Sequence, residues 1–142
     1  MDKFSDALVA VQKSGRVFNR LMTETARSIG MTKPEMDILL FLHNNPQYDK
    51  AADISELRFL AKSYVSKAVD LLQKRGMLEV HTDEVDRRIM RLRVTEAASP
   101  ALEKAKETQV QFLQLLFEGV TCEEIQVLQG IHEKMMKNLE KQ

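Results

Sequence analysis

The sequence has little cysteine and no long run of apolar residues. Its single cysteine, Cys122, excludes a disulfide within the chain. The longest apolar run, residues 38–42, is far shorter than the roughly 20 residues that a membrane-spanning helix needs. The first residues carry no basic region ahead of an apolar stretch, so no secretory signal is expected. These absences predict a soluble cytoplasmic protein with no membrane partner.

The sequence also lacks the motifs of common catalytic and metal sites. It shows no glycine-rich phosphate loop, no paired-carboxylate motif and no serine–histidine–aspartate order. The three histidines, His43, His81 and His132, are spread over three predicted elements, which is not the ligand spacing of a zinc site. We therefore expect no enzymatic activity, no metal site and no cofactor.

Net charge gives no support for a nucleic-acid partner, but the distribution of charge does. The chain balances 21 basic against 21 acidic residues. Residues 62–93 hold 8 basic and 5 acidic side chains, an excess of +3, whereas residues 94–142 hold 5 basic and 8 acidic ones. A local positive excess is what one face needs to meet phosphate, although a solvated face can have the same composition.

Helical spacing of apolar residues marks the N-terminal part of the chain. Phe4, Leu8, Val11, Phe18 and Met22 follow steps of three, four and seven, which predicts a long amphipathic helix ending near residue 30. The sequence Thr-Lys-Pro-Glu at 32–35 is a capping box with proline in the first turn. It predicts a second helix that runs to about residue 43.

Two short helices and a hairpin are predicted in the middle of the chain. The first helix begins near Asp53 and directs Ile54, Leu57 and Leu60 inward. The second spans 62–75 and closes at Gly76, with Lys74 and Arg75 placed to complement its dipole. It exposes a polar face that consists of Ser63, Tyr64, Ser66, Lys67 and Asp70.

Period two replaces helical spacing after residue 76. Leu78 and Val80 alternate with polar residues, as do Met90, Leu92 and Val94, and a charged turn at 82–88 separates the two segments. Helices return near Ser99, where Pro100 fits only the first turn, and after a second capping box at 121–124. The predicted fold class is therefore mainly α with a small β-hairpin wing, that is, a winged helix-turn-helix with flanking dimerisation helices.

Two motifs resemble the MarR-type family of winged helix-turn-helix transcriptional regulators. Residues 62–78, KSYVSKAVDLLQKRGML, are similar to the recognition helix and first wing strand of that family. Residues 86–88, Asp-Arg-Arg, and 92–96, Leu-Arg-Val-Thr-Glu, resemble its wing signature and the entry to its fifth helix. Ala61 departs from the pattern, because a capping serine or threonine is frequent there. Ser63 could bond the backbone instead, which leaves the start of this helix open by a residue or two.

The resemblance implies a DNA-binding regulator, in the first place a repressor, that reads a pseudo-palindromic duplex. A helix fits the major groove, and a hairpin beside it can send arginines into the minor groove. By this resemblance Asp86 orients Arg88, and Arg87 or Arg88 reaches the minor groove. In the major groove the expected contacts are Lys62, Ser63, Tyr64, Ser66 and Lys67. The alternative is a winged-helix module that binds another protein and no specific DNA.

Dimerisation is expected because the short helices and hairpin cannot cover the apolar stripes of three long helices. We expect one MarR-like domain over 1–142, with a DNA-binding lobe at 33–94 and dimerisation helices at 1–30 and 99–142. The predicted homodimer interface comprises Phe4, Leu8, Val11, Leu113, Phe117, Ile125, Leu128, Met135 and Leu139.

The family resemblance also implies release from DNA by a small aromatic acid or phenol. Arg16, Met22, Met36 and His43 are candidate ligand-binding residues, although methionines of this kind are more often core or interface filler. Cys122 falls in the first turn of the last helix, a position that can make a thiol reactive, so it is either a redox sensor or an inert interface thiol.

Overall fold

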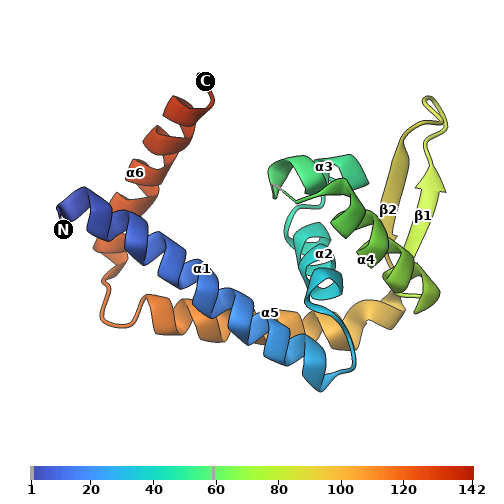
Figure 1. The fold of residues 1–142 in the computed structure, drawn as a ribbon, viewed down its shortest axis with the longest axis horizontal. Coiled ribbons are helices and arrows are strands. Elements are labelled where there is room, and N and C mark those ends of the chain that lie inside the picture. Colours follow the sequence, from blue (N-terminus) through green and yellow to red (C-terminus); the bar gives the residue numbers. More distant parts are fainter. Residues whose placement is uncertain (1, 59) are drawn as a thin grey trace. The chain divides into compact units, whose positions relative to one another are not determined.

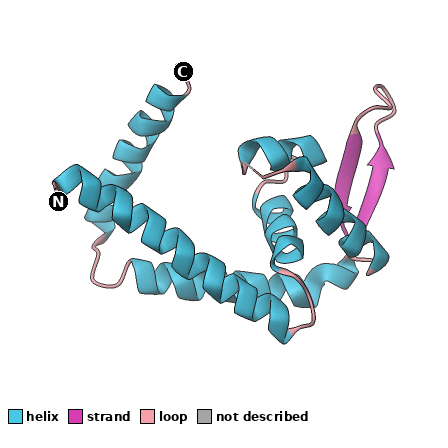
Figure 2. Cartoon of the chain, viewed as in Figure 1, coloured by secondary structure: helices cyan, strands magenta, loops and turns pink. Residues whose placement is uncertain are grey.

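The computed structural model describes residues 2–58 and 60–142. Most of the chain is helical, and a single antiparallel hairpin projects beside the central helices (Figures 1 and 2). The predicted fold class, mainly α with a small hairpin, is confirmed. In chain order the elements are α1 (Lys3–Ser28), α2 (Lys33–Asn44), α3 (Ala51–Leu57), α4 (Lys62–Lys74), β1 (Leu78–Thr82), β2 (Met90–Val94), the 3-10 helix η1 (Glu96–Ala98), α5 (Ser99–Leu116) and α6 (Cys122–Leu139).

The chain divides into two compact units, one ending at Phe112 and the other spanning Leu113–Gln142. The first contains α1 to η1 and most of α5, whereas the second contains the end of α5 and all of α6. The core lies in the first unit. The described residues include no helix that is long and apolar enough to cross a membrane.

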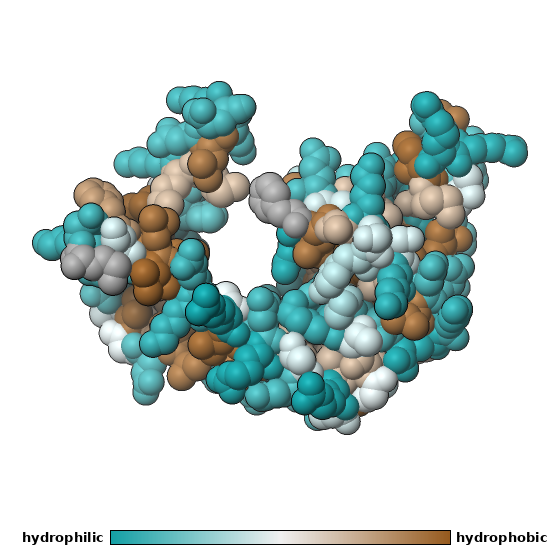
Figure 3. Space-filling model, viewed as in Figure 1, coloured by the Kyte–Doolittle hydropathy of each residue, from teal (hydrophilic) through white to brown (hydrophobic). Residues whose placement is uncertain are grey.

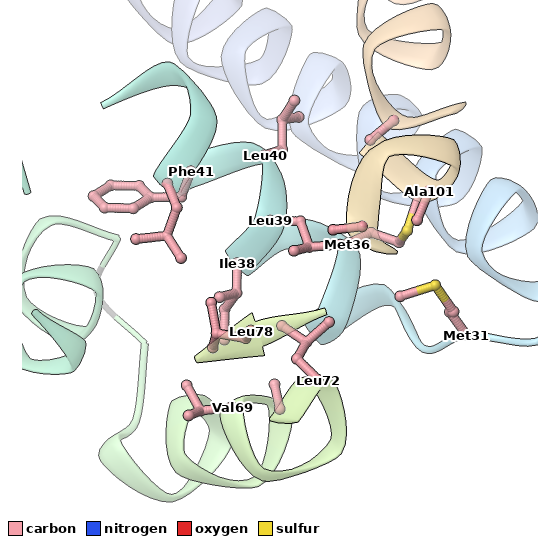
Figure 4. Packing of buried hydrophobic residues seen from close by; sticks show 14 of the residues in the cluster. Met31, Met36, Ile38, Leu39, Leu40, Phe41, Val69, Leu72, Leu78 and Ala101 are labelled. Carbon is pink, nitrogen blue, oxygen red and sulfur yellow. The ribbon is translucent and has the colours of Figure 1, made fainter. Parts of the chain in front are cut away.

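Helix α2 is the centre of the core, since every residue from Glu35 to Leu42 is buried. Ile38 of α2 is directed toward Leu78 of β1 and Leu72 of α4 (Figure 4). On the other side of α2, Met36 and Leu39 lie near Ala101 of α5 (Figure 4). A helix that is buried on all sides has to be surrounded by other elements, and α2 therefore fixes the positions of α4 and the hairpin.

Helices α1 and α5 are joined by an aromatic pair and by a polar pair. The rings of Phe18 and Phe112 pack edge to face with their centroids 5.1 Å apart, a favoured arrangement for aromatic side chains. The hydroxyls of Thr25 and Thr108 are 2.6 Å apart. These contacts hold the N-terminal helix along the part of α5 that belongs to the first unit.

A buried carboxylate joins the start of α2 to the end of α4. Glu35 is fully buried, and its Oε1 accepts hydrogen bonds of 3.0 Å from the amide and the hydroxyl of Thr32, as the predicted capping box requires. Its Oε2 accepts a bond of 2.6 Å from Nε of Arg75, whose Nη2 donates to the carbonyl of Gly30 at 2.9 Å. Arg75 thus pairs with a carboxylate 40 residues away, whereas the sequence suggested only that it complements the helix dipole.

A second polar contact holds the first half of α4 against α2. The Tyr64 hydroxyl donates to Oδ2 of Asp37 at 3.3 Å, and Lys33 forms an ion pair with the same carboxylate. Burial, followed by the charge of Asp37, raises the pKa of Tyr64 to about 12. Tyr64 therefore remains protonated at neutral pH and donates a hydrogen bond to Asp37 of α2.

Helix α3 is shorter and more exposed than its sequence suggests. Ile54 is buried and Leu60 packs against the core, as predicted. The prediction that Leu57 points inward is wrong, because 45% of it is exposed. Leu57 is the last residue of a helix of only seven residues.

The hairpin has a regular register in which Leu78 pairs with Val94, Val80 with Leu92 and Thr82 with Met90. Leu78 and Leu92 are buried and direct one face of the hairpin to the core, which matches the predicted period of two. The loop before α3 joins this sheet, because the amide of Leu92 donates to the carbonyl of Asp49 at 2.7 Å and Lys50 forms a bridge with Arg91.

Replacing Glu35 with alanine should lower the free energy of unfolding by about 3 kcal/mol, since it leaves the Arg75 guanidinium and the Thr32 cap without their acceptor. Urea unfolding followed by circular dichroism measures this. Glu24→Ala is the matched control: Glu24 is also in a helix, but its ion pair with Arg20 is mostly exposed, so it should cost less than about 1 kcal/mol. Equal losses in the two variants would contradict the role given to Glu35.

Tyr64 should ionise near pH 12, and the tyrosinate step there should be missing in Tyr64→Phe. Because the folded pKa lies above the ordinary value of 10.0, the contribution of Tyr64 to stability is complete below pH 10 and is lost as the pH rises toward 12. Ultraviolet absorbance follows the two tyrosines of the chain. Asp37→Asn should move the step to lower pH, and an unmoved step would contradict the contact with Asp37.

Candidate DNA-binding interface

The exposed face of α4 carries most of the predicted major-groove set. Lys62, Ser63, Ser66 and Lys67 are all exposed, and each lies in the first half of the helix. Val65, Ala68 and Leu72 are buried on the opposite face. The side chains that could donate to bases or phosphates are therefore held on a helix whose back is fixed in the core.

Helix α4 begins at Lys62, with Ala61 in the N-cap position and no capping side chain. The amide of Val65 bonds the carbonyl of Ala61 at 3.2 Å, which is the first helical bond. The start that the sequence left open is thus fixed, and Ser63 does not cap the helix.

The prediction that Tyr64 lies on the exposed face of this helix is wrong. Its ring is half-buried, and its hydroxyl is bonded to Asp37. Helical spacing missed this because Tyr64 lies at the border between the apolar and the polar faces. The Asp37 carboxylate, 27 positions earlier, turns it inward. The Tyr64 hydroxyl thus bonds α2 and holds α4 against it.

The turn at the end of the hairpin is organised by Asp83. Its Oδ2 accepts bonds from the amides of Val85 and Asp86 at 3.2 and 2.8 Å, and its Oδ1 accepts from Nε of Arg91 at 2.8 Å. The amide of Asp86, followed by the Arg91 guanidinium, holds the pKa of the Asp83 carboxyl below its usual range. Asp83 therefore remains an acceptor at neutral pH and fixes the backbone that leads to Asp86.

Asp86 and Arg88 form a bidentate ion pair. Arg88 Nε lies 3.0 Å from Oδ1 of Asp86 and Arg88 Nη2 lies 3.1 Å from Oδ2. The amide of Arg88 also donates to Oδ1 at 3.1 Å. The Arg88 bonds lower the pKa of Asp86, and Asp86 raises the pKa of Arg88. The arginine side chain is nevertheless 91% exposed, so the pair fixes its direction and leaves its outer edge free.

The same turn exposes Arg87 and Val85. Arg87 is exposed next to the ion pair, and Val85 is 96% exposed at the tip. Val85 was not among the predicted site residues, although an apolar residue inside a charged turn was a visible signal. Figure 3 shows hydrophilic and hydrophobic side chains together at the end of the hairpin. The tip thus offers both cationic and apolar contacts.

A groove of about 440 Å³ runs between α3, α4 and the hairpin. Lys62 and Ser66 line one side, Ala51 and Ser55 another, and Val80 and Met90 come from the strands. The groove separates the exposed face of α4 from the strands. The two parts of the interface are therefore distinct surfaces of one compact unit.

The four candidate ligand-binding residues are not brought together. Met22 and Met36 are fully buried in the core, and Arg16 is exposed on α1. His43 borders a separate open cleft of about 560 Å³ between the end of α2 and β2. Among the residues that the structure describes, no group of three or more histidine, cysteine or acidic side chains could hold a metal ion.

The residues predicted for the dimer interface are largely exposed in the single chain. Phe4, Leu8 and Val11 on α1 are 86%, 67% and 68% exposed. In the second unit Leu128 is 50% exposed and α6 has no buried residue. Leu113, Met135 and Leu139 are likewise exposed, whereas Phe117 and Ile125 are half-buried beside a shallow groove of that unit. Cys122 is exposed at the first residue of α6.

Comparison with known proteins shows which family these features resemble. Residues 29–89, which include α2, α3, α4, β1 and most of the turn, match the model of the MarR family. A MarR-family transcriptional regulator from Silicibacter pomeroyi is 20% identical to this chain, with a TM-score of 0.81 over 93% of this chain and 88% of its own. A MarR protein from Peptoclostridium difficile is 25% identical, with a TM-score of 0.79 over 96% and 88%.

The likeness extends to a MarR transcriptional regulator from Methanosarcina mazei Go1, which is 16% identical with a TM-score of 0.79 over 97% of this chain and 99% of its own. Members of this family are transcriptional regulators and not enzymes. The family model thus matches α2 to the wing turn, and the solved MarR-family structures share the fold of this chain over almost its whole length.

Proposed function

We propose that this chain represses transcription by binding a pseudo-palindromic duplex site as a homodimer. In this proposal 33–94 form the DNA-binding lobe, and 1–30 and 99–142 form the dimerisation region. The exposed face of α4 enters the major groove, and the end of the hairpin enters the minor groove. The observation that carries the proposal is the Asp86–Arg88 ion pair, which holds an almost fully exposed guanidinium at the tip of the wing.

Two surfaces of different chemistry support this assignment. Lys62 and Lys67 can meet phosphates, while Ser63 and Ser66 can bond base edges or phosphate oxygens. Arg88 suits the minor groove, where the negative potential is concentrated, because Asp86 fixes its direction before DNA arrives. Arg87 adds a second exposed cation at the same turn.

The apolar surface of the two chain ends supports the homodimer. Helix α6 has 18 residues, none of them buried, and exposes Leu128, Ile131 and Met135. A helix in a globular protein derives most of its stability from packing its apolar face, so α6 requires a partner. A second copy, which offers the same surfaces of α1 and α6, buries them about a two-fold axis and places two α4 helices roughly 34–36 Å apart.

An effector belongs to the same proposal. A small aromatic or phenolic ligand would release the protein from DNA, as the family resemblance implies. Of the four candidate residues, His43 has the clearest structural support, since it borders a cleft that reaches β2. The cleft is lined by apolar Leu42, Pro46 and Leu102 and by Tyr48.

A protein-binding module without specific DNA affinity is the competing function. The two are separated by gel shift on DNA from the promoter region of the protein's own gene and on a random duplex. A DNA-binding protein binds the random duplex at low salt, and its log affinity falls by about 0.9 per neutralised phosphate for each log unit of salt. Absence of binding to both duplexes at low salt would favour the protein-binding module.

Arg88→Ala should weaken binding to the promoter duplex by about tenfold or more, because it removes the guanidinium from the wing tip. Ser63→Ala should change which duplex sequence is preferred, as measured by selection from a random pool. Arg20→Ala is the control, since Arg20 is an exposed arginine on α1 outside the interface. The residue assignment is wrong if Arg88→Ala and Arg20→Ala bind equally well.

Leu128→Asp should convert the dimer to a monomer, because it places a charge on the apolar face of α6. Sedimentation velocity measures the change, and the affinity for a two-half-site duplex should fall with it. Gln126→Asp introduces the same charge at an exposed polar position of the same helix and should leave the dimer intact. A monomeric wild-type chain at micromolar concentration, or a Leu128→Asp variant that stays dimeric, would refute the assigned interface.

A further inference from the structure

A chain of charge-assisted hydrogen bonds connects the loop before α3 to the tip of the wing. Nη1 of Arg91 lies 2.7 Å from Oδ1 of Asp49, and Nε lies 2.8 Å from Oδ1 of Asp83. Asp83 in turn accepts the amide of Asp86, whose carboxylate holds Arg88. Arg91 is thus the bridge between the body of the lobe and the turn that carries the exposed arginine.

We propose that Arg91, anchored by Asp49, is a positioning residue that sets the direction of the wing and through it the approach of Arg88 to DNA. This inference rests on the proposed function. It adds two residues, neither of which the sequence pointed to as part of the site. Their effect on DNA binding would come from where they hold the hairpin turn and not from contact with the DNA.

Two features of Arg91 favour positioning over direct contact. Its Nε and Nη1 atoms are already engaged by two carboxylates, and its side chain is 41% exposed, compared with 91% for Arg88. Asp83 and Asp49 both raise the pKa of Arg91, with the hydrogen bond to Asp83 as the larger cause. A guanidinium held in this way supports the turn, and two of its three nitrogens are already bonded to carboxylates.

The backbone reinforces the same anchor. The amide of Leu92 donates to the carbonyl of Asp49, and Lys50 bridges to Arg91 in antiparallel pairing. The loop before α3 is therefore bonded to β2 through its main chain, and the side chain of Asp49 adds an ion pair with Arg91. The backbone bonds hold the strand in place. The hydrogen bond from Arg91 then connects the strand to the turn at Asp83, eight residues earlier.

Two arginines on the same strand allow an effect of positioning to be distinguished from an effect of charge. Arg93 is exposed on β2 two residues after Arg91, and within the described part of the chain it has no ion pair shorter than 4.0 Å. Arg91→Gln and Arg93→Gln remove the same charge from the same strand. If the wing is positioned as proposed, Arg91→Gln weakens binding to the promoter duplex by about tenfold and Arg93→Gln by about threefold or less.

The double variant with Arg88→Ala tests whether Arg91 acts through Arg88. In the Arg88→Ala background, Arg91→Gln should cost no more than about twofold, because the contact that it positions is already absent. An equal loss in both backgrounds would mean that Arg91 acts on its own, and the proposal would be overturned.

Asp49→Asn makes the sharpest distinction, because an effect of charge and an effect of positioning predict opposite changes in DNA affinity. Removing a negative charge near DNA should raise the affinity, whereas loss of the anchor of Arg91 should lower it severalfold. Glu79→Gln, which removes an exposed acid from β1, is the control and should not lower the affinity. Tighter binding by Asp49→Asn would overturn the proposal.

A measurement on the free protein separates failure of this inference from failure of the proposed function. Amide ¹⁵N relaxation of residues 83–89 should show faster local motion in Arg91→Gln and Asp49→Asn than in Arg93→Gln, with or without DNA. A rigid turn in both variants would refute the positioning role. If the turn becomes mobile but no variant changes DNA affinity, the positioning role stands and the DNA contact of the wing is wrong.

Discussion

The fully buried carboxylate of Glu35 is the contact on which the arrangement of the lobe depends. One oxygen caps α2 through Thr32, and the other accepts Nε of Arg75 at the end of α4. The start of α2 and the end of α4, the candidate recognition helix, are thus both bonded to one carboxylate. Arg75 also donates to the carbonyl of Gly30 at the junction of α1 and α2. A displacement of either helix would leave charged groups without partners inside the protein, which costs several kcal/mol.

Features that depend on neighbouring residues could be predicted from the sequence. The capping boxes at Thr32 and Thr121 involve residues three apart, and the change from helix to hairpin at Gly76 shows in the local periodicity. The pairing of Arg75 with Glu35 and the inward turn of Tyr64 could not be predicted, because their partners lie 40 and 27 positions away. Helical spacing assigns a face to each residue, but a carboxylate on another helix can move a residue at the border of that face.

The candidate site divides in the same way. Asp86 and Arg88 are two residues apart, and the family resemblance was sufficient to associate them. Arg91 needed the structure, because Asp49 comes from a loop 42 positions earlier. The turn of the wing is therefore encoded by neighbouring residues. The contact of Arg91 with Asp49, which supports the turn, forms only in the folded lobe. The exposed side chains and Asp86 were predictable, whereas Arg91 and Asp49, which support the turn, were not.

The ion pairs of this lobe also have a consequence for how the protein would search a genome. Arg75 and Arg91 each face a carboxylate from outside residues 62–93, namely Glu35 and Asp49, so the positive excess of that segment is partly neutralised before any DNA is met. Non-specific affinity comes from the counterions that free cations release from DNA, and Arg75 and Arg91 contribute less to it because carboxylates already hold them. On the proposed function, such a protein would spend less time on random sequence than one with all of these cations unpaired. Its occupancy of a true operator would then depend mainly on the fit of two aimed wings and two recognition helices, not on bulk charge.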